Sequence, residues 1–183
     1  MKILYCENPI WTPGEPTDVS LLVDSSLSRN FHPLFLPPHS SEWRLTTGIA
    51  IRIVRLGKFI SARFAHRYYD AATLIARLRP ANLRLPATAT MTAFDSSAVV
   101  GEWMPLGDGA PEAITIGGDA DLTLPFDREA VDNLVEHLSQ YFMLKTGDII
   151  VAGDIDGFIR TPQIDTSLRL TLNGSECLNF KIK

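Results

Sequence analysis

The stretch TTGIAIRIVRLGKFI, residues 46–60, decides the fold of this chain. Isoleucine recurs at every second position from Ile49 to Ile53, which is the period of a strand that buries one face. Gly57 and Lys58 follow as a turn, and the chain then starts another element. The stretch therefore predicts a half-buried strand that enters on Thr46 and Thr47 and leaves through a Gly-Lys turn.

Further strands are predicted on both sides of this stretch. Residues 2–5 and 21–23 are short apolar runs, and residues 148–152 (DIIVA) are typical of a buried strand. Residues 167–172 and 178–182 flank Asn173-Gly174, a dipeptide that strongly favours a two-residue hairpin turn. These segments predict that strands dominate the fold.

Helices are fewer. Residues 127–142 carry apolar side chains at three- and four-residue spacing behind Asp127, a residue that favours a helix N-cap. Residues 61–69 predict a short helix opening with Ser61. Residues 70–85 are ambiguous, because their Ala and Leu content favours helix whereas Pro80 ends any helix there. Roughly eight strands and two or three helices make a β-rich α+β fold.

Composition indicates one ordinary globular domain spanning residues 1–183, in which residues 1–20 form a short N-terminal strand and loop. The chain has 45% hydrophobic and 21% charged residues and a net charge of −4, so we expect no nucleic-acid partner. It contains no long apolar stretch, and its first apolar run is too short for a signal peptide, so we expect no membrane partner and a cytoplasmic location. Cys6 and Cys177 are expected to be reduced thiols.

Positive charge is concentrated in residues 52–84, which contain eight Lys or Arg residues and a single acid, Asp70. A solvated basic face and an anion-binding surface are both consistent with this pattern.

Several segments, in the same order along the chain, resemble the fumarylacetoacetate hydrolase family. Residues 141–153, YFMLKTGDIIVAG, resemble the family's segment in which Gly-Asp opens a buried strand, and residues 94–101, FDSSAVVG, its Phe-Asp run. Residues 32–41 resemble its proline-punctuated strand, residues 49–69 its strand, Gly-Lys turn and helix, and residues 2–8 its opening strand.

The resemblance implies a rolled, mixed β-sheet and a homodimer. It also implies hydrolysis, decarboxylation, isomerisation or hydration of acylpyruvate-type diketo acids. In the family a Glu-x-Glu and an Asp hold Mg²⁺ or Mn²⁺, which polarises the keto-enolate oxygens of the substrate.

The positions that correspond to these carboxylates carry none. Thr46 and Gly48 stand at the Glu-x-Glu positions, and Arg77 stands near the third ligand. Thr92 replaces a Lys that precedes Phe-Asp, and residues 8–12 lack the family's His. We therefore expect no metal or other cofactor.

Three readings of the function follow. The first is a catalytically inactive relative that binds a small carboxylate through Thr46, Arg77 and Thr92, or that serves as a subunit partner. The second is an active hydrolase, isomerase or decarboxylase on acylpyruvate-type keto acids, with catalytic groups re-sited to His39, Glu42 or Asp95. The third is a structural protein that acts through its dimer surface or through the basic residues 52–84.

Two further sequence patterns give weaker evidence for a functional site. The Asp154-x-Asp156 pair lacks the other residues of a calcium loop and is expected in a solvated loop. His66 and His137 lie on expected helices and are interpreted as ordinary surface or core histidines.

Overall fold

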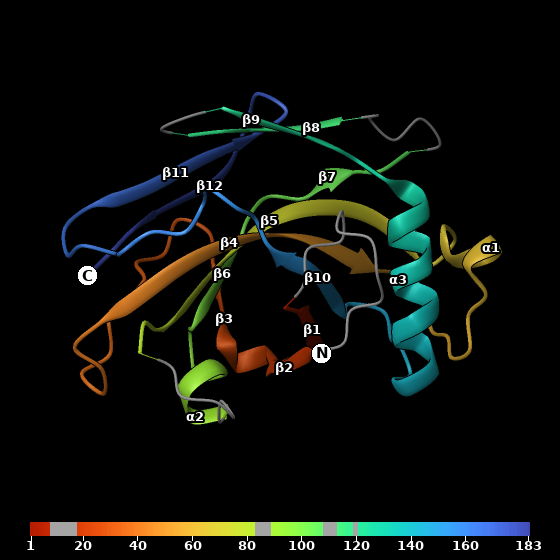
Figure 1. Ribbon diagram of the computed structural model, residues 1–183, viewed down its shortest axis with the longest axis horizontal. Coiled ribbons are helices and arrows are strands. Elements are labelled where there is room, and N and C mark those ends of the chain that lie inside the picture. The colour runs from red at the N-terminus through yellow and green to blue at the C-terminus, as the bar shows by residue number, and fades with distance from the viewer. Residues whose placement is uncertain (8–17, 83–88, 108–112, 119–120) are drawn as a thin grey trace.

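A computed structural model describes residues 1–7, 18–82, 89–107, 113–118 and 121–183 (Figure 1). Within these residues it contains twelve strands, three α-helices and one 3-10 turn, more strands than the sequence predicted. In chain order these are β1 (Lys2–Cys6), β2 (Val19–Val23), η1 (Asp24–Ser26), β3 (Leu27–Arg29), β4 (Trp43–Ile53), α1 (Ala62–Ala65), β5 (Tyr69–Pro80), α2 (Ala89–Thr92), β6 (Ala98–Val100), β7 (Met104–Pro105), β8 (Ala113–Gly117), β9 (Leu122–Pro125), α3 (Arg128–Tyr141), β10 (Ile149–Asp154), β11 (Ser167–Leu172) and β12 (Ser175–Lys181).

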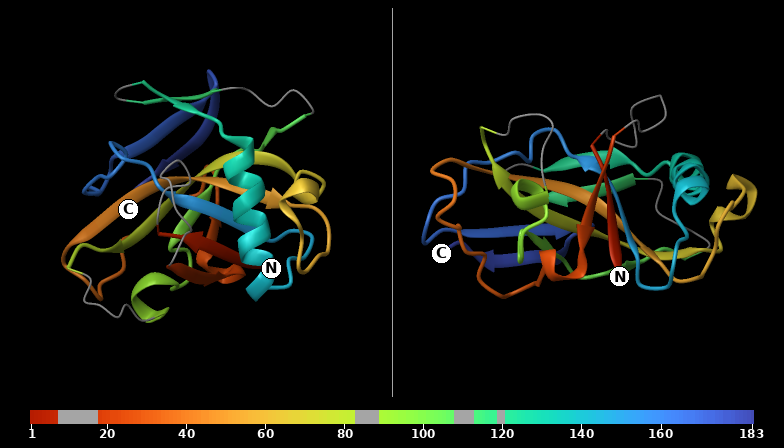
Figure 2. Two further views of the ribbon diagram at one scale, coloured as in Figure 1. Left: turned by 45° about the vertical axis from the view of Figure 1, so that its right-hand side comes forward. Right: turned by 90° about the horizontal axis from the view of Figure 1, so that it is seen from below.

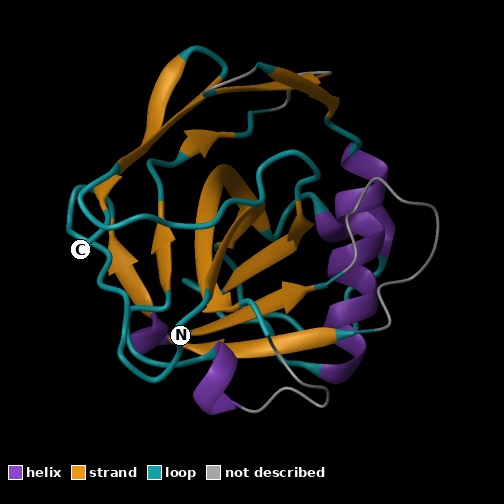
Figure 3. Ribbon diagram, turned by 60° about the vertical axis from the view of Figure 1, so that its left-hand side comes forward, coloured by secondary structure: helices purple, strands orange, loops and turns teal. Residues whose placement is uncertain are grey.

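The larger sheet has eight strands and curls into a roll (Figure 3). Its order is β2-β1-β10-β4-β5-β6-β3, with β7 also paired to β5. The β1–β10 and β3–β6 pairs are parallel and the others antiparallel, so the sheet is mixed. The two end strands, β2 and β3, are joined only by the three residues of η1. The ends of the sheet must therefore approach each other, which gives the β-rich α+β architecture with a rolled sheet that the sequence predicted.

Strands β4 and β5 form the long antiparallel pair at the centre of this sheet. The predicted isoleucine face of residues 49–54 is buried. On the opposite face Arg52 and Val54 are partly exposed as predicted, whereas Ala50 is buried, so β4 is more buried than a half-buried strand. The helical preference of residues 70–85 was misleading, because Tyr69–Pro80 is strand β5. Pairing with β4 on one side and with β6 and β7 on the other overrides the Ala and Leu propensity. The predicted helix at residues 61–69 shortens to α1, because β5 begins at Tyr69.

A second, four-stranded sheet, β12-β11-β8-β9, and helix α3 cover the outside of the roll (Figure 1). They bury the main core against β4 and β5, with Val131, Leu134, Val135 and Leu138 on the inner face of α3. Two local predictions are confirmed here. Asp127 caps α3 by accepting from the backbone N–H of Ala130 at 3.1 Å, and Asn173-Gly174 turns between β11 and β12 with positive φ at both residues.

A smaller core fills the inside of the roll. Ile3 and Tyr5 of β1 pack there with Ala98 of β6, although these strands lie in opposite halves of the sheet order. The view from below in Figure 2 shows β1 and β2 crossing beneath the long strands. Cys6 and Cys177 are both buried free thiols. None of the helices in the described ranges is long and apolar enough to span a membrane.

Candidate functional site

A buried arginine lies at one end of the inside of the roll. Arg77 on β5 is directly opposite Thr46 on β4 and Ala98 on β6, and its side chain is 0% exposed. Its guanidinium stacks on the ring of Tyr5, with 4.3 Å between its central carbon and the ring centroid. The interpretation of residues 52–84 as a solvated basic face is therefore wrong at this position, because alternation along β5 turns Arg77 into the roll.

The carboxylate of Glu7 neutralises this arginine. It accepts from Arg77 Nη1 at 3.1 Å, from Arg79 Nη1 at 3.3 Å and from the Ser20 hydroxyl at 2.6 Å. Burial alone would raise the pKa of Glu7, but the Ser20 hydrogen bond and the two arginine charges outweigh it and hold the pKa below its ordinary value. Glu7 is therefore a charged counter-ion at neutral pH.

Asp154 at the end of β10 completes the network. It accepts from Arg79 Nη2 at 2.6 Å and from the Tyr5 hydroxyl. Burial and then the Asp154 charge raise the pKa of Tyr5 far above its ordinary value, so the phenol stays protonated as a donor. Asp154 therefore belongs to an ion-pair network, and not to the solvated loop that its Asp-x-Asp pattern predicted.

The network leaves one edge of Arg77 unpaired. Among the described residues, no acceptor meets its Nε or Nη2, and the buried Thr46 hydroxyl opposite it lies near the Tyr5 hydroxyl without a hydrogen bond of normal geometry. Nε and Nη2 carry parallel N–H groups, the edge of a guanidinium that fits both oxygens of a carboxylate. Buried polar groups are normally hydrogen-bonded, so three such atoms without a partner among the described residues are unusual.

Solved structures share this architecture over the whole chain. A Yersinia pestis protein assigned to the fumarylacetoacetate hydrolase family superimposes with a TM-score of 0.82 at 16% identity, covering 100% of this chain and 93% of that one. Fumarylpyruvate hydrolase from Pseudomonas aeruginosa, solved with Mn²⁺ and pyruvate, gives 0.80 at 17% identity, covering 99% and 88%. The 5-carboxymethyl-2-hydroxymuconate delta-isomerase of Mycobacterium smegmatis gives 0.79 at 17% identity, covering 99% and 76%. The chain has the fumarylacetoacetate hydrolase fold. No family model matches its sequence, and no curated protein does.

The residues at the expected metal positions of this hydrolase fold do not fit Mg²⁺ or Mn²⁺. Thr46, Gly48 and Arg77 supply no carboxylate, and the guanidinium charge repels a cation. A Cβ atom at Gly48 would lie 2.4 Å from the carbonyl oxygen of Gly153, so a glutamate there would require β10 to move. No group of three or more metal-binding side chains occurs in the part of the chain that the structure describes.

The other predicted site residues lie elsewhere in the hydrolase fold. Thr92 is buried on α2, whereas His39, Glu42 and Asp95 are exposed. His39 packs edge-on against Trp43 and Phe94, with ring centroids 4.9 Å and 5.0 Å away. No hydrogen bond or ion pair between described residues joins His39 to Glu42. Residues 8–12, where the sequence lacks the family's His, lie outside the described ranges.

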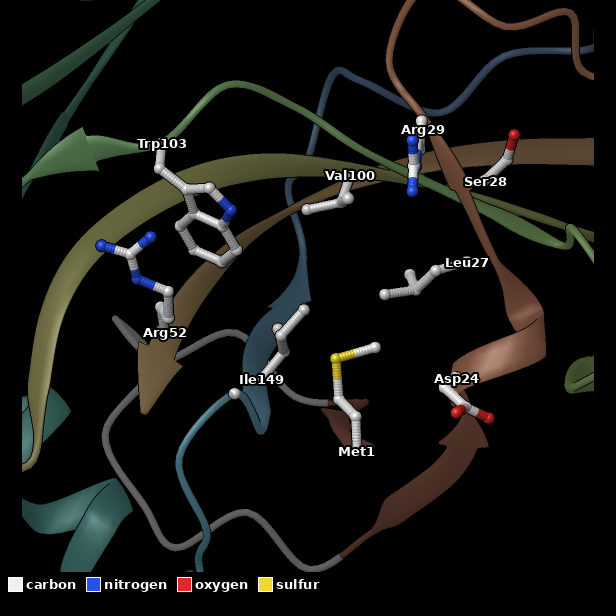
Figure 4. A pocket seen from close by; sticks show the side chains of 10 residues that line it. Met1, Asp24, Leu27, Ser28, Arg29, Arg52, Val100, Trp103 and Ile149 are labelled. Carbon is white, nitrogen blue, oxygen red and sulfur yellow. The ribbon is translucent and has the colours of Figure 1, made fainter. Parts of the chain in front are cut away.

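A pocket of about 460 Å³ opens at the opposite end of the roll (Figure 4). Arg52 and Ile149 line it at the other ends of β4 and β10, and Trp103 forms one wall. The Arg52 guanidinium lies 5.3 Å from the Trp103 ring centroid and forms two hydrogen bonds of 2.8 Å with Asp70. Asp70 occupies the Nε and Nη2 edge of Arg52, which is the edge that Arg77 leaves unpaired, so Arg52 has fewer donors available for an anion.

Sequence reasoning missed Tyr5, Glu7, Arg79 and Asp154. One available signal was the i, i+2 spacing of Arg77 and Arg79, which places both side chains on one face of a strand. That signal has meaning only if residues 69–80 form a strand, and their composition favours helix. The acids that pair with the two arginines are Asp154 on β10 and Glu7 directly after β1. They are so far from the arginines in the sequence that no local pattern reveals the pairs.

Proposed function

We propose that this chain binds a small carboxylate at Arg77 and does not carry out the metal-dependent diketo-acid chemistry associated with its fold. It would act as a binding protein or as the partner of another subunit. The observation that supports this is the unpaired Nε and Nη2 edge of a completely buried guanidinium, opposite an unpaired Thr46 hydroxyl.

Hydrogen bonding by the charged donor edge of Arg77 favours an anionic acceptor over a neutral one. A hydrogen bond from a charged donor contributes about 1.5–3 kcal/mol, and leaving such a donor unmet costs a comparable amount. Two parallel N–H groups would satisfy both oxygens of one carboxylate. Glu7 and Asp154 balance Arg77 and Arg79, so a bound monoanion would leave the site with one net negative charge.

The chemistry of a guanidinium also limits which reactions a site built on Arg77 could catalyse. Arg77 provides a fixed single positive charge with directed donors, and it can hold a carboxylate in place. It lacks the open coordination positions with which a divalent metal chelates and polarises a keto-enolate. Pyruvate, which the Pseudomonas hydrolase structure contains together with Mn²⁺, is therefore a suitable probe, and oxalate is a second.

The test is titration calorimetry and thermal shift with pyruvate and oxalate, each with and without Mn²⁺. A ligand at about a hundred times its dissociation constant stabilises the fold by about 2.7 kcal/mol, which raises the melting temperature by several degrees. We expect binding without Mn²⁺. Binding that requires Mn²⁺, or turnover of an acylpyruvate that is lost in Glu42→Gln, would contradict the proposal.

The variant Thr46→Val separates ligand binding from folding. It keeps the shape of a buried side chain and removes an unmet hydroxyl, so the ligand-free protein should be no less stable. Loss of a hydrogen bond to a charged ligand should weaken affinity about ten-fold or more. Thr47→Val, on the opposite face of the same strand, is the matched control and should retain the affinity. Equal affinities in both variants would contradict a role for Thr46.

A further inference from the structure

Exposed apolar side chains gather where α1 meets the end of α3. Leu56, Phe59, Phe64, Tyr141 and Met143 have exposed fractions between 42% and 74%, with Phe59 the highest. Four cations lie on the same segment, Arg55, Lys58, Arg63 and Arg67. We call these nine residues the α1 patch.

The two parts of the patch are held side by side by backbone contacts. Gly57 and Leu144 exchange N–H···O bonds of 3.0 Å and 2.8 Å, and the Phe59 N–H donates to the Ser139 carbonyl at 3.1 Å. The Lys58 ammonium reaches the carbonyl of Tyr141 at 3.4 Å. Figures 1 and 2 show α1 beyond α3 at an edge of the molecule, so the patch lies on a projecting end.

Residues 55–67 contain four cations and no acid, whereas the whole chain has a net charge of −4. The nearest carboxylate in contact with this segment is Glu136 of α3, which accepts from the Ala62 N–H at 3.0 Å. None of the four forms an ion pair with any described residue. They instead lie over rings, with Arg63 and Arg67 at 5.4 Å and 5.0 Å from the Phe64 ring centroid and Lys58 at 5.2 Å from that of Phe59.

Phe59 is the most exposed member and has an unfavourable backbone conformation. Its φ is 54°, a left-handed value that Gly and Asn adopt more easily than an aromatic residue does. The fold therefore holds a large apolar ring in water at a strained position. This arrangement contributes little to the stability of the free protein, so the ring is available for an external surface.

We propose that the α1 patch binds an anionic phospholipid membrane surface, with Phe59 and Leu56 entering the interface and the cations meeting lipid phosphates. Aromatic rings flanked by Lys and Arg suit the headgroup layer, and a projecting end can reach a flat bilayer. A second copy of the chain suits the patch less well, because it would bring like charges together. The expectation of no membrane partner rested on the lack of a long apolar segment, a criterion that does not detect a patch built from two short ones.

The test is co-sedimentation of the full chain with phosphatidylcholine vesicles, with and without phosphatidylserine. We expect binding only to the anionic vesicles, decreasing strongly in about 1 M salt, where the screening length is about 3 Å. Arg63→Gln should weaken partitioning about five-fold, the equivalent of one cation at the surface. Arg169→Gln, an exposed arginine on β11, is the control and should leave partitioning unchanged.

Phe59→Asn tests the apolar contact between the patch and the membrane without destabilising the fold. Asn accepts the left-handed φ, so the melting temperature should stay equal or rise while vesicle binding falls several-fold. Phe31→Asn is a matched control, because Phe31 is also exposed with a φ of 66° but lies outside the patch. Unchanged vesicle binding in Phe59→Asn would overturn the proposal. Two other results would overturn it. Binding to polyglutamate but not to vesicles would indicate an acidic protein partner, and a dimer that dissociates in Phe59→Asn would indicate a second copy of the chain.

Discussion

The substitution Glu7→Gln isolates the electrostatic contribution of the counter-ion to the buried Arg77. Glutamine keeps the size of the side chain and can still accept from Arg77 Nη1, so the main loss is the negative charge. Removing one partner of a buried ion pair costs about 3–5 kcal/mol, because the other charge remains uncompensated. Glu7 is 28% exposed, and the remaining acid Asp154 pairs with Arg79, so water screens part of this loss. We therefore expect a loss of about 2–3 kcal/mol in the free energy of unfolding.

Urea unfolding at neutral pH measures this value. With a slope of about 2 kcal/mol per molar, the midpoint should fall by about 1–1.5 M. Glu42→Gln is the control, because Glu42 is exposed and forms no ion pair with another described residue, and it should stay within about 0.5 kcal/mol of the unmodified chain. In the double variant Glu7→Gln/Arg77→Met, much of the stability should return, since no buried charge is left unpaired. If Glu7→Gln is as stable as the Glu42→Gln control, Glu7 is not the counter-ion on which Arg77 depends.

Two further predictions concern β10 and its neighbours. Burial favours a raised pKa for Asp148, but hydrogen bonds from the Lys2 side chain and from the Lys2 and Lys145 N–H groups hold that pKa below its ordinary value. Its contribution to stability is therefore complete above about pH 4, the region of the unfolded pKa, and is lost as the pH falls further. In urea titrations the stability difference between Asp148→Asn and the unmodified chain should stay constant from neutral pH down to about pH 4 and shrink below it. Gly48→Ala places a Cβ 2.4 Å from the Gly153 carbonyl oxygen and should cost about 1–3 kcal/mol or more in the same assay. Gly107→Ala, with no atom within 4 Å of the added Cβ, should be close to neutral, and equal losses in the two variants would refute the packing argument.

The parts of the fold that the sequence predicted correctly depend on contacts between residues close in the chain. The Asp127 cap needs only the N–H of Ala130 three residues later, and the Asn173-Gly174 turn needs only the positive φ that these residues accept. The prediction for residues 69–80 was misleading because partners distant in the sequence decide the secondary structure of this segment. Ala and Leu favour helix in isolation, but β4 and β6 lie on both sides and hold the segment as a strand.

The sequence by itself showed that Thr46, Gly48 and Arg77 supply no carboxylate to a metal, because residue identity alone decides that chemistry. Only the tertiary structure decided what surrounds them. The curl of the sheet brings Glu7 and Asp154 to the buried Arg77 and the partly exposed Arg79, and the β4–β5 register places Thr46 opposite Arg77. The Arg79–Asp154 ion pair, for example, joins residues that are 75 positions apart in the chain. They follow from register and sheet curvature, which are collective properties of the packed chain and leave no pattern in a short window of sequence.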